Sequence, residues 1–401
     1  QAEDGIRDVE RSRGLGDVYK RQVIMVNLFP SQKSGVKLHH LIKAPENTPW
    51  ALEKKHSWDA SKPATVYVTP ELTKEGEPCK AATVILRTKG CHWWWSSGCT
   101  FCGYFNDTRD DVTSDDLHNQ WDYSMKKLNN FEDVEMIKVY TSGSLLEDRE
   151  IPLEFQEFVL KETHKLGKHL VIESRTEQLT SDKLSWAKKF NPNFTVAIGL
   201  EAYDDEVLRF HVNKGFSLKS WHNAVEQLKN HSLRIKSYLM FKPPFMSEGE
   251  SLTQCIKWVK SVVNDSDEIS INPMNIQRGT IIDRLYRNGD YRPPWLWSLV
   301  ELIKQVHPFV KQGDKVLSRL IVHPTAAGKP RGAHNCGTCD AEVAAAIERY
   351  SVSGTLDEFS DLSCECYSRW KEEIYSDQNL PVPIGVGLNR RKKIEKLFDF
   401  Y

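Results

Sequence analysis

Cysteines gathered in two groups are the residues of this sequence best suited to metal chemistry. Seven of the nine cysteines belong to these two groups. Thiols clustered in a chain without an apolar signal core are more typical of metal ligands than of disulfides. The other two, Cys79 and Cys255, stand alone and are predicted to pack in the core. The first group is Cys91, Cys99 and Cys102, and the second is Cys336, Cys339, Cys364 and Cys366.

The first group has the pattern C-x7-C-x2-C and no fourth cysteine near it in sequence. Three such thiolates can hold three irons of a 4Fe–4S cluster, which leaves the fourth iron open to an outside ligand. On spacing alone, a zinc site completed by His92 is an alternative.

The second group pairs C-x2-C with C-x-C after 24 intervening residues. Four thiolates in two close pairs predict a closed, structural zinc site that stabilises a small domain. His334 is a possible replacement for one cysteine, and a second iron–sulfur cluster is the other alternative.

Short apolar runs alternate with helical segments along the middle of the chain. Strands are expected at 83–88, 135–141, 169–174, 194–201, 233–241 and 268–274. Helices are expected between them at 114–130, 152–166, 180–190, 217–230 and 249–264. This alternation predicts an α/β fold, a partial (β/α)6 barrel with a parallel sheet. In such barrels the chemistry collects on loops at the carboxyl ends of the strands.

Polar and glycine residues stand at or just after the ends of the six predicted strands, so they are expected to converge on one mouth. Glycine lets the backbone approach a ligand closely, carboxylates suit hydroxyl or ammonium groups, and guanidinium binds carboxylates. An ordinary turn and a structural ion pair are the alternatives. The candidate ligand-binding residues are Ser142, Gly143, Ser144, Glu173, Arg175 and Glu201. The candidate substrate-binding residues, suited to phosphates or base edges, are Lys236, Lys242, Asn272, Asn275, Gln277 and Arg278.

Composition shifts predict how the chain divides. A polar leader, 1–24, is interpreted as non-native or disordered, with Met25 a candidate start. An N-terminal extension at 25–80 precedes the barrel at 81–285. A connecting segment, 286–325, holds a helix, a strand at 315–323 and the run YRPPWLW, whose aromatic rings either stack on an extruded base or pack in the core. A small C-terminal zinc-binding domain, 326–401, contains a helix at 341–350 and a basic tail.

Net charge and hydropathy indicate which classes of partner the chain can have. The formal net charge is −1 and 40% of residues are hydrophobic. No apolar run reaches the length of a membrane span, so a cytoplasmic location without a membrane partner is expected. The balanced charge neither favours nor excludes nucleic acid. A basic cluster near the C-terminus is either a contact or a solvated helix face: Arg390, Arg391, Lys392, Lys393 and Lys396.

The first cysteine loop resembles the radical S-adenosylmethionine (SAM) signature, with Phe101 as the aromatic residue before the last cysteine. The first spacing is seven residues instead of the usual three. From about residue 80 to 370 the sequence is similar to the family of the radical SAM subunit of archaeosine synthase, whose members share this longer spacing. The resemblance rests on ILRTKGC, SGCTFCGY, YTSGSLLEDRE, VIESRTE, AIGLEAYDDEV, NKGF, LMFKPPF, INPMNIQRGT, YRPPWLWS, HNCGTCDAEVAAAI and CEC.

This resemblance implies a radical SAM barrel with a 4Fe–4S cluster on Cys91, Cys99 and Cys102, SAM at its open iron and a structural Zn²⁺. The stretch 142–144 stands where the family binds the methionine amino group of SAM. Glu173 would bind the ribose hydroxyls or the ammonium group of SAM and Arg175 its carboxylate. Glu201 would bind SAM or the substrate amine.

The resemblance also implies the reaction, a radical C–N lyase step in tRNA modification. A 5′-deoxyadenosyl radical would start cleavage of the lysine adduct of 7-cyano-7-deazaguanine in the tRNA D-arm, which leaves archaeosine. The implied partners are tRNA, the lysine-transferring subunit and an electron donor. One alternative is another radical SAM tRNA-modifying enzyme, of the methylthiotransferase or Elongator type, and a second is a non-catalytic zinc-dependent tRNA-binding protein.

Overall fold

One sheet of eight strands organises the protein. The computed structural model describes residues 58–73, 75–128 and 131–379; the predicted leader 1–24 and the basic cluster after residue 389 lie outside this range. The strands follow the spatial order β1-β2-β3-β4-β5-β6-β7-β10. Only the edge pair β1–β2 is antiparallel. The bounds of the eight strands are β1 Thr65–Leu72, β2 Pro78–Ile85, β3 Met136–Tyr140, β4 His169–Ser174, β5 Phe194–Glu201, β6 Arg234–Phe241, β7 Glu268–Pro273 and β10 Arg319–Val322.

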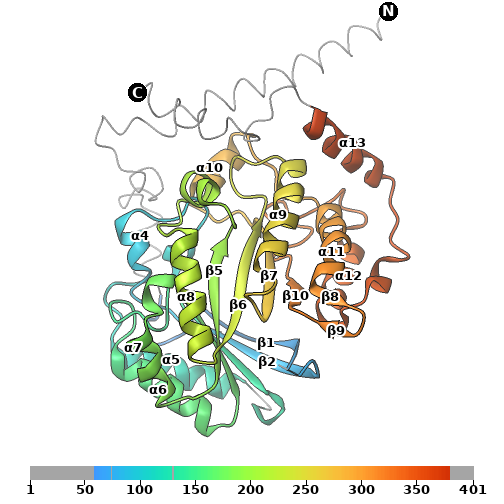
Figure 1. The fold of residues 1–401 in the computed structure, drawn as a ribbon. Coiled ribbons are helices and arrows are strands. Elements are labelled where there is room, and N and C mark those ends of the chain that lie inside the picture. The colour runs from blue at the N-terminus through green and yellow to red at the C-terminus, as the bar shows by residue number, and fades with distance from the viewer. Residues whose placement is uncertain (1–57, 74, 129–130, 380–401) are drawn as a thin grey trace, which may run out of the picture.

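Helices cover the outer face of this curled sheet, and α4 and α10 lie at the end toward which the arrow of β5 points (Figure 1). A hairpin, β8 Lys311–Gln312 and β9 Lys315–Val316, precedes β10 at the opposite end. Among the described residues, no helix has both the length and the apolar character needed to cross a bilayer. The helices are α4 His92–Ser96, α5 Ser114–Lys127, α6 Leu153–Lys165, α7 Ser181–Lys188, α8 Leu218–Asn230, α9 Glu248–Val262, α10 Ile281–Arg287, α11 Leu296–Val310, α12 Asp340–Ser353 and α13 Cys366–Asn379.

Alternation along the strands divides the buried residues between the two faces of the sheet. In β3, Ile137 and Val139 belong to the large core under the helices. Their neighbours point the other way because successive side chains of a strand alternate. Met136 packs there in a small inner cluster with Ala81, Val171 and Ala197. Lys138, also on the inner side, pairs with Glu71 of β1. The concave face is therefore partly charged, unlike the apolar outer face.

The six predicted parallel strands are confirmed as β2 to β7, with ends shifted by a few residues. Two further strands join the sheet: β1, which lies in the predicted N-terminal extension, and β10, which lies in the predicted connecting segment. Both extend the sheet at its edges. The sequence analysis also did not foresee α4, inside the cysteine loop, or α13, which begins at Cys366.

Candidate functional site

The first cysteine loop is tied to the segment after β5. Cys91 directly precedes α4, and the Nε1–H of Trp93 in that helix donates to the carbonyl of Asn213 at 2.8 Å. The Asn213 side chain donates back to the carbonyl of Gly98 at 2.6 Å. The backbone N–H of Thr100 donates to Val212 at 2.9 Å. These bonds fix the loop on both sides of Cys99 at the carboxyl end of the sheet.

The three thiols of this loop are largely enclosed. Burial raises the pKa of Cys91 to about 11, and it also raises the pKa values of Cys99 and Cys102. Metal binding would therefore have to displace protons from the thiols. In the described part of the chain, only the second cysteine group has all its ligand atoms within 4.8 Å of one another. The first three thiols do not form such a close group.

His92 does not complete a zinc site with these thiols. Its Nδ1 lies 2.6 Å from a carboxylate oxygen of Glu147, and its Nε2 lies 3.3 Å from one of Glu177. Both ring nitrogens thus face carboxylates, which disfavours the zinc alternative.

The loop after β3 lies directly against Cys91. A Cβ atom built on Gly143 would lie 2.9 Å from both Cα and Cβ of Cys91, so only glycine fits. The buried carboxylate of Glu150 accepts the backbone N–H groups of Ser142, Gly143 and Ser144 at 2.8–3.1 Å, and the hydroxyl of Thr88 at 2.6 Å. Because Glu150 takes these N–H groups, the loop can offer a ligand its carbonyl oxygens. That suits an ammonium group.

Arg175 is a buried cation with spare hydrogen-bonding capacity. Its Nε donates to Glu177 at 2.7 Å and its Nη1 to the carbonyl of Lys214 at 3.1 Å. Its Nη2 is buried without a hydrogen-bond partner among the described residues. The guanidinium interacts electrostatically with Cys91 and Cys99. An unpaired donor beside the cysteines fits an anionic group of a cofactor bound there.

Glu201 and Lys214 form a buried ion pair near the same cysteines. Lys214 Nζ lies 2.9 Å from Glu201 Oε1, and the ammonium interacts electrostatically with Cys99. Glu201 has φ 68°, in the left-handed region, at an irregularity where β5 pairs with β6. Strain of this kind is held by the surrounding structure and is typical of functional sites. The pair leaves Glu201 Oε2 for a ligand.

Glu173 lies on the concave face among tyrosines. Its carboxyl interacts with the hydroxyl of Tyr238, which in turn interacts with that of Tyr140. Burial raises the pKa of Glu173 to about 7, and repulsion from Glu201 acts in the same direction. Glu173 lies within β4, whereas Arg175 lies just beyond its end and pairs with Glu177.

The predicted substrate-binding residues separate into two sets. Lys236 is buried with Nζ 3.5 Å from Glu268, and Lys242 is buried with Nζ 2.7 Å from Glu248. The set after β7 lies at the mouth, where the side chain of Gln277 contacts Gly103 and the carbonyl of Arg278 accepts from Asn106 at 2.9 Å. Asn275 accepts from Arg331 at 2.9 Å, and Asn272 accepts from Ser270 at 3.2 Å. The structure brings this second set close to the cysteine loop and pairs each lysine within the chain.

The aromatic residues of YRPPWLW do not form a stacking platform. Tyr291, Trp295 and Trp297 are all buried. Trp297 Nε1 donates to Cys366 Sγ at 3.3 Å, and the hydroxyl of Tyr291 donates to the carbonyl of Lys242 at 2.6 Å. The stacking hypothesis is therefore wrong, and these side chains join the core to the second cysteine group.

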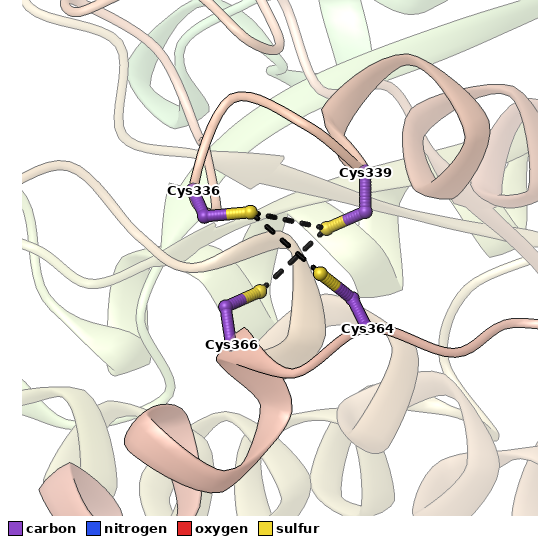
Figure 2. A group of neighbouring side chains, drawn as sticks. All are labelled: Cys336, Cys339, Cys364 and Cys366. Atoms are coloured by element: carbon purple, nitrogen blue, oxygen red, sulfur yellow. Dashed lines mark hydrogen bonds between the residues drawn. The ribbon is translucent and has the colours of Figure 1, made fainter.

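The second cysteine group forms a compact set of four thiols (Figure 2). The Sγ–Sγ distances from Cys336 to Cys339, from Cys336 to Cys364 and from Cys339 to Cys366 are 3.7–4.0 Å. Tetrahedral coordination at about 2.3 Å would place sulfurs about 3.8 Å apart, so these distances fit a single tetrahedral ion. His334 is not part of the group; its Nδ1 contacts the carbonyl of Gly332 at 2.8 Å. Cys79 and Cys255 are buried, which confirms that they pack in the core.

Sequence reasoning missed two residues of the first site. Glu150 and Lys214 both lie inside strings that carried the family resemblance, GSLLEDRE and NKGF, but neither was given a role. Glu150 accepts hydrogen bonds from backbone N–H groups, and Lys214 pairs with a carboxylate at the end of β5. Neither interaction leaves a recognisable spacing of residue types in the sequence.

The curled parallel sheet and the three-cysteine loop at its carboxyl end define a radical SAM half-barrel. No family model matches the chain. Archaeosine synthase subunit beta from Methanosarcina acetivorans is 34% identical over 78% of this chain and 90% of its own length. The same subunit from Thermococcus kodakarensis is 31% identical over 76% and 95%. The chain belongs to the archaeosine synthase subunit beta family.

Solved structures that resemble the chain are more distant. The Elp3 of Methanocaldococcus infernus is 15% identical with a TM-score of 0.45, covering 68% of this chain and 63% of its own. Methylornithine synthase is 15% identical with a TM-score of 0.43, covering 68% of each chain.

Proposed function

We propose that the chain is a radical SAM C–N lyase that converts the lysine adduct of 7-cyano-7-deazaguanine in tRNA to archaeosine. Family membership supports this proposal, and so do the buried cations Arg175 and Lys214 near the three thiols. A 4Fe–4S cluster with SAM supplies, when bound, the 5′-deoxyadenosyl radical that removes a hydrogen from the lysine part of the substrate. C–N cleavage would leave the amidine on the base and release the lysine fragment, and one electron from the proposed electron donor, together with a proton, would remove the unpaired electron left by hydrogen abstraction.

The residues around the cysteines have complementary roles in this proposal. Cys91, Cys99 and Cys102 hold three irons and leave one open. The carbonyl oxygens of 142–144, freed because Glu150 takes the N–H groups, receive the amino group of SAM. The unpaired Nη2 of Arg175 receives the carboxylate of SAM. This buried, unpaired donor is the observation that carries the proposal.

The acids of the concave face would act on SAM hydroxyls and on the substrate. Glu173 suits the ribose hydroxyls because a partly protonated carboxyl can both donate and accept. Glu201, whose Oε1 is bound to Lys214, has Oε2 available for the amine of the lysine adduct. Phe101 packs between the apolar clusters and supports the loop.

The tRNA base must leave its stack to reach a site at the mouth of the sheet, at a cost of a few kcal/mol. Asn275, Gln277 and Arg278 lie at this mouth and suit base edges or phosphate. Lys236 and Lys242, paired with buried glutamates, would hold the walls of the cavity. The proposed partners are tRNA, the subunit that attaches lysine, and an electron donor.

The second cysteine group is proposed to hold Zn²⁺ as a structural ion. All four positions are filled by thiols, so no site stays open for catalysis. The ion would link the start of α12 with the start of α13, since Cys339 and Cys366 lie there.

Anaerobic reconstitution with SAM, a reductant and lysine-modified tRNA tests the proposal. Formation of 5′-deoxyadenosine together with archaeosine is expected. Arg175→Lys should raise the KM for SAM, because a lysine lacks the planar fork that bonds Glu177 and the Lys214 carbonyl and still leaves Nη2 for a ligand. About four irons and one zinc per chain are expected. Two zinc ions per chain without iron would instead support a non-catalytic, zinc-dependent tRNA-binding protein. Radical formation without archaeosine would support a different tRNA modification.

A further inference from the structure

The loop between β10 and the second cysteine group, residues 323–335, lies at the mouth of the sheet. β10 runs parallel to β7, so the two strands end at the same edge. The loop contacts the segment after β7: the N–H of Ile276 donates to the carbonyl of Arg331 at 2.7 Å, and Arg331 Nη1 donates to Asn275 Oδ1 at 2.9 Å. We call residues 323–335 the rim loop.

A continuous set of contacts joins the rim loop to the first cysteine loop. Gly103, next to Cys102, lies against Gln277, where an added Cβ would be 2.6 Å from the Gln277 Cβ. Asn106 bonds the carbonyl of Arg278, and Asn275, a few residues earlier, bonds Arg331. The rim loop therefore borders the path by which a substrate reaches the cysteines.

The rim loop is folded on itself. The N–H of Gly328 donates to Ala333 at 2.9 Å and the N–H of Gly332 donates to Lys329 at 3.0 Å. A Cβ atom on Gly332 would lie 2.2 Å from the carbonyl oxygen of Ala326, so glycine is required there. Ala326 itself has φ 59°, in the left-handed region. These contacts close residues 326–333 into a tight turn.

The end of the rim loop is fixed to the second cysteine group. Asn335 Nδ2 donates to Cys339 Sγ at 3.3 Å, and its N–H donates to Asp340 at 2.8 Å. Arg292 Nη2 donates to the carbonyl of His334 at 2.8 Å. The four-cysteine group thus holds the loop in position at the mouth.

The charge of the rim loop is positive. The segment HPTAAGKPRGAHN contains one lysine, one arginine and no acid. Lys329, Pro330 and Arg331 are exposed at its tip, while Gly332 and Ala333 are buried. The bond to Asn275 fixes the plane of the Arg331 guanidinium, which has five N–H donors and so keeps others for a ligand. A pre-oriented guanidinium beside an ammonium is suited to phosphate oxygens.

We propose that Lys329 and Arg331, with the neighbouring exposed Arg278, form a phosphate-binding rim that holds the RNA backbone beside the nucleotide entering the mouth. RNA is favoured as the occupant because this rim borders the substrate path and places cations where backbone phosphates next to an extruded base would lie. The inference rests on the proposed tRNA substrate and names the surface that binds it.

The test measures tRNA binding by the full-length, metal-loaded protein over a range of salt concentrations, without reductant. The variant Lys329→Ala/Arg331→Ala should bind about tenfold more weakly, and the slope of log affinity against log salt should fall by about one for each lost phosphate contact. The matched control is Lys311→Ala/Lys315→Ala, which removes the same charge from the β8–β9 hairpin at the opposite end of the sheet. This control should keep the wild-type slope.

A second variant keeps every charge and disturbs only the turn. Gly332→Ala should weaken tRNA binding, because its Cβ would displace the Ala326 carbonyl and with it the Arg331 backbone. Circular dichroism and metal content show whether the variant is folded. Equal effects of the hairpin and rim variants would overturn the proposal, as would a rim variant that binds tRNA normally but loses its partner subunit. A wild-type protein without salt-dependent tRNA binding would instead contradict the proposed function.

Discussion

Replacing Gly143 by alanine tests whether the loop after β3 must touch the first cysteine loop. The added Cβ would lie 2.5 Å from Glu150 Oε2 and 2.9 Å from the Cα of Cys91. Ordinary contact begins at 3.4 Å, so the carboxylate would have to move by 0.9 Å (3.4 − 2.5) and the cysteine backbone by 0.5 Å (3.4 − 2.9). Glu150 is held by Ser142, Gly143 and Ser144, so it is the less mobile side.

Both movements add to the cost. Displacing Glu150 would break hydrogen bonds to a buried carboxylate, each worth about 1.5–3 kcal/mol. Moving the Cys91 backbone is an overpacking effect of about 1–3 kcal/mol. With one such hydrogen bond lost, Gly143→Ala should lose about 2.5–6 kcal/mol of unfolding free energy and shift Cys91 away from the other two thiols.

Two measurements separate stability from metal binding. Chemical denaturation gives the unfolding free energy of the iron-free protein, and anaerobic reconstitution gives the iron content per chain. Gly143→Ala should take up several-fold less iron than wild type. Gly289→Ala is the control: its backbone has φ +77°, so alanine is strained there by about 1–3 kcal/mol, but nothing lies within 4 Å of the added Cβ. It should lose stability and keep its iron.

Full iron uptake by Gly143→Ala, with normal radical formation from SAM, would refute the reasoning. It would mean that the loop and Cys91 can separate without consequence for the cluster. A loss of iron in the Gly289→Ala control would equally show that iron uptake follows stability alone.

Three further predictions concern the charged and metal-binding groups. Because burial raises the pKa of Glu173 to about 7 from 4.5, the folded protein keeps a proton that the unfolded chain releases. Its contribution to stability is present below about pH 4.5 and is lost as the pH rises through about 7, so Glu173→Gln should flatten this slope in denaturation curves and gain a few kcal/mol at pH 8; an unchanged slope would contradict the assignment. Lys214→Met leaves Glu201 buried without its cation and should cost about 3–5 kcal/mol, while the double variant with Glu201→Gln should recover most of it; additive losses would exclude the coupling. Cys364→Ser should remove the ion of the second group and lower the Tm while the iron content stays, and a parallel loss of iron would show that the two sites are not independent.

The sheet could be predicted because its strands carry local patterns. Runs such as FTVAIGLE are largely apolar, since parallel strands are covered on both faces. β1 was missed because it lies at the edge with most of its side chains at least partly exposed, and because Pro70 interrupts it. A strand near residue 320 was expected, but its pairing with β7 depends on contacts with residues about fifty positions earlier, such as Arg319 with Glu268.

The site could be predicted only where residue type alone signals chemistry. Both cysteine groups were recognised in this way. Lys242 looked like a ligand-binding residue, but its partner Glu248 is buried in the next helix. Lys138 and Glu71 are paired across 67 positions of sequence, which no local pattern reveals. Charged residues in strands suggest a solvated face, whereas here they line the concave side of the sheet.

The anchoring of the first cysteine loop separates folding from metal loading. Trp93, Gly98 and Thr100 are bonded to residues 211–213 by groups that do not need iron. The loop that carries the thiols is therefore held in place before any iron binds. A chain that has lost its cluster to oxygen should keep this loop and be repaired by iron and sulfide without passing through the unfolded state. Loss of the cluster would then be reversible, because the fold that receives it stays intact.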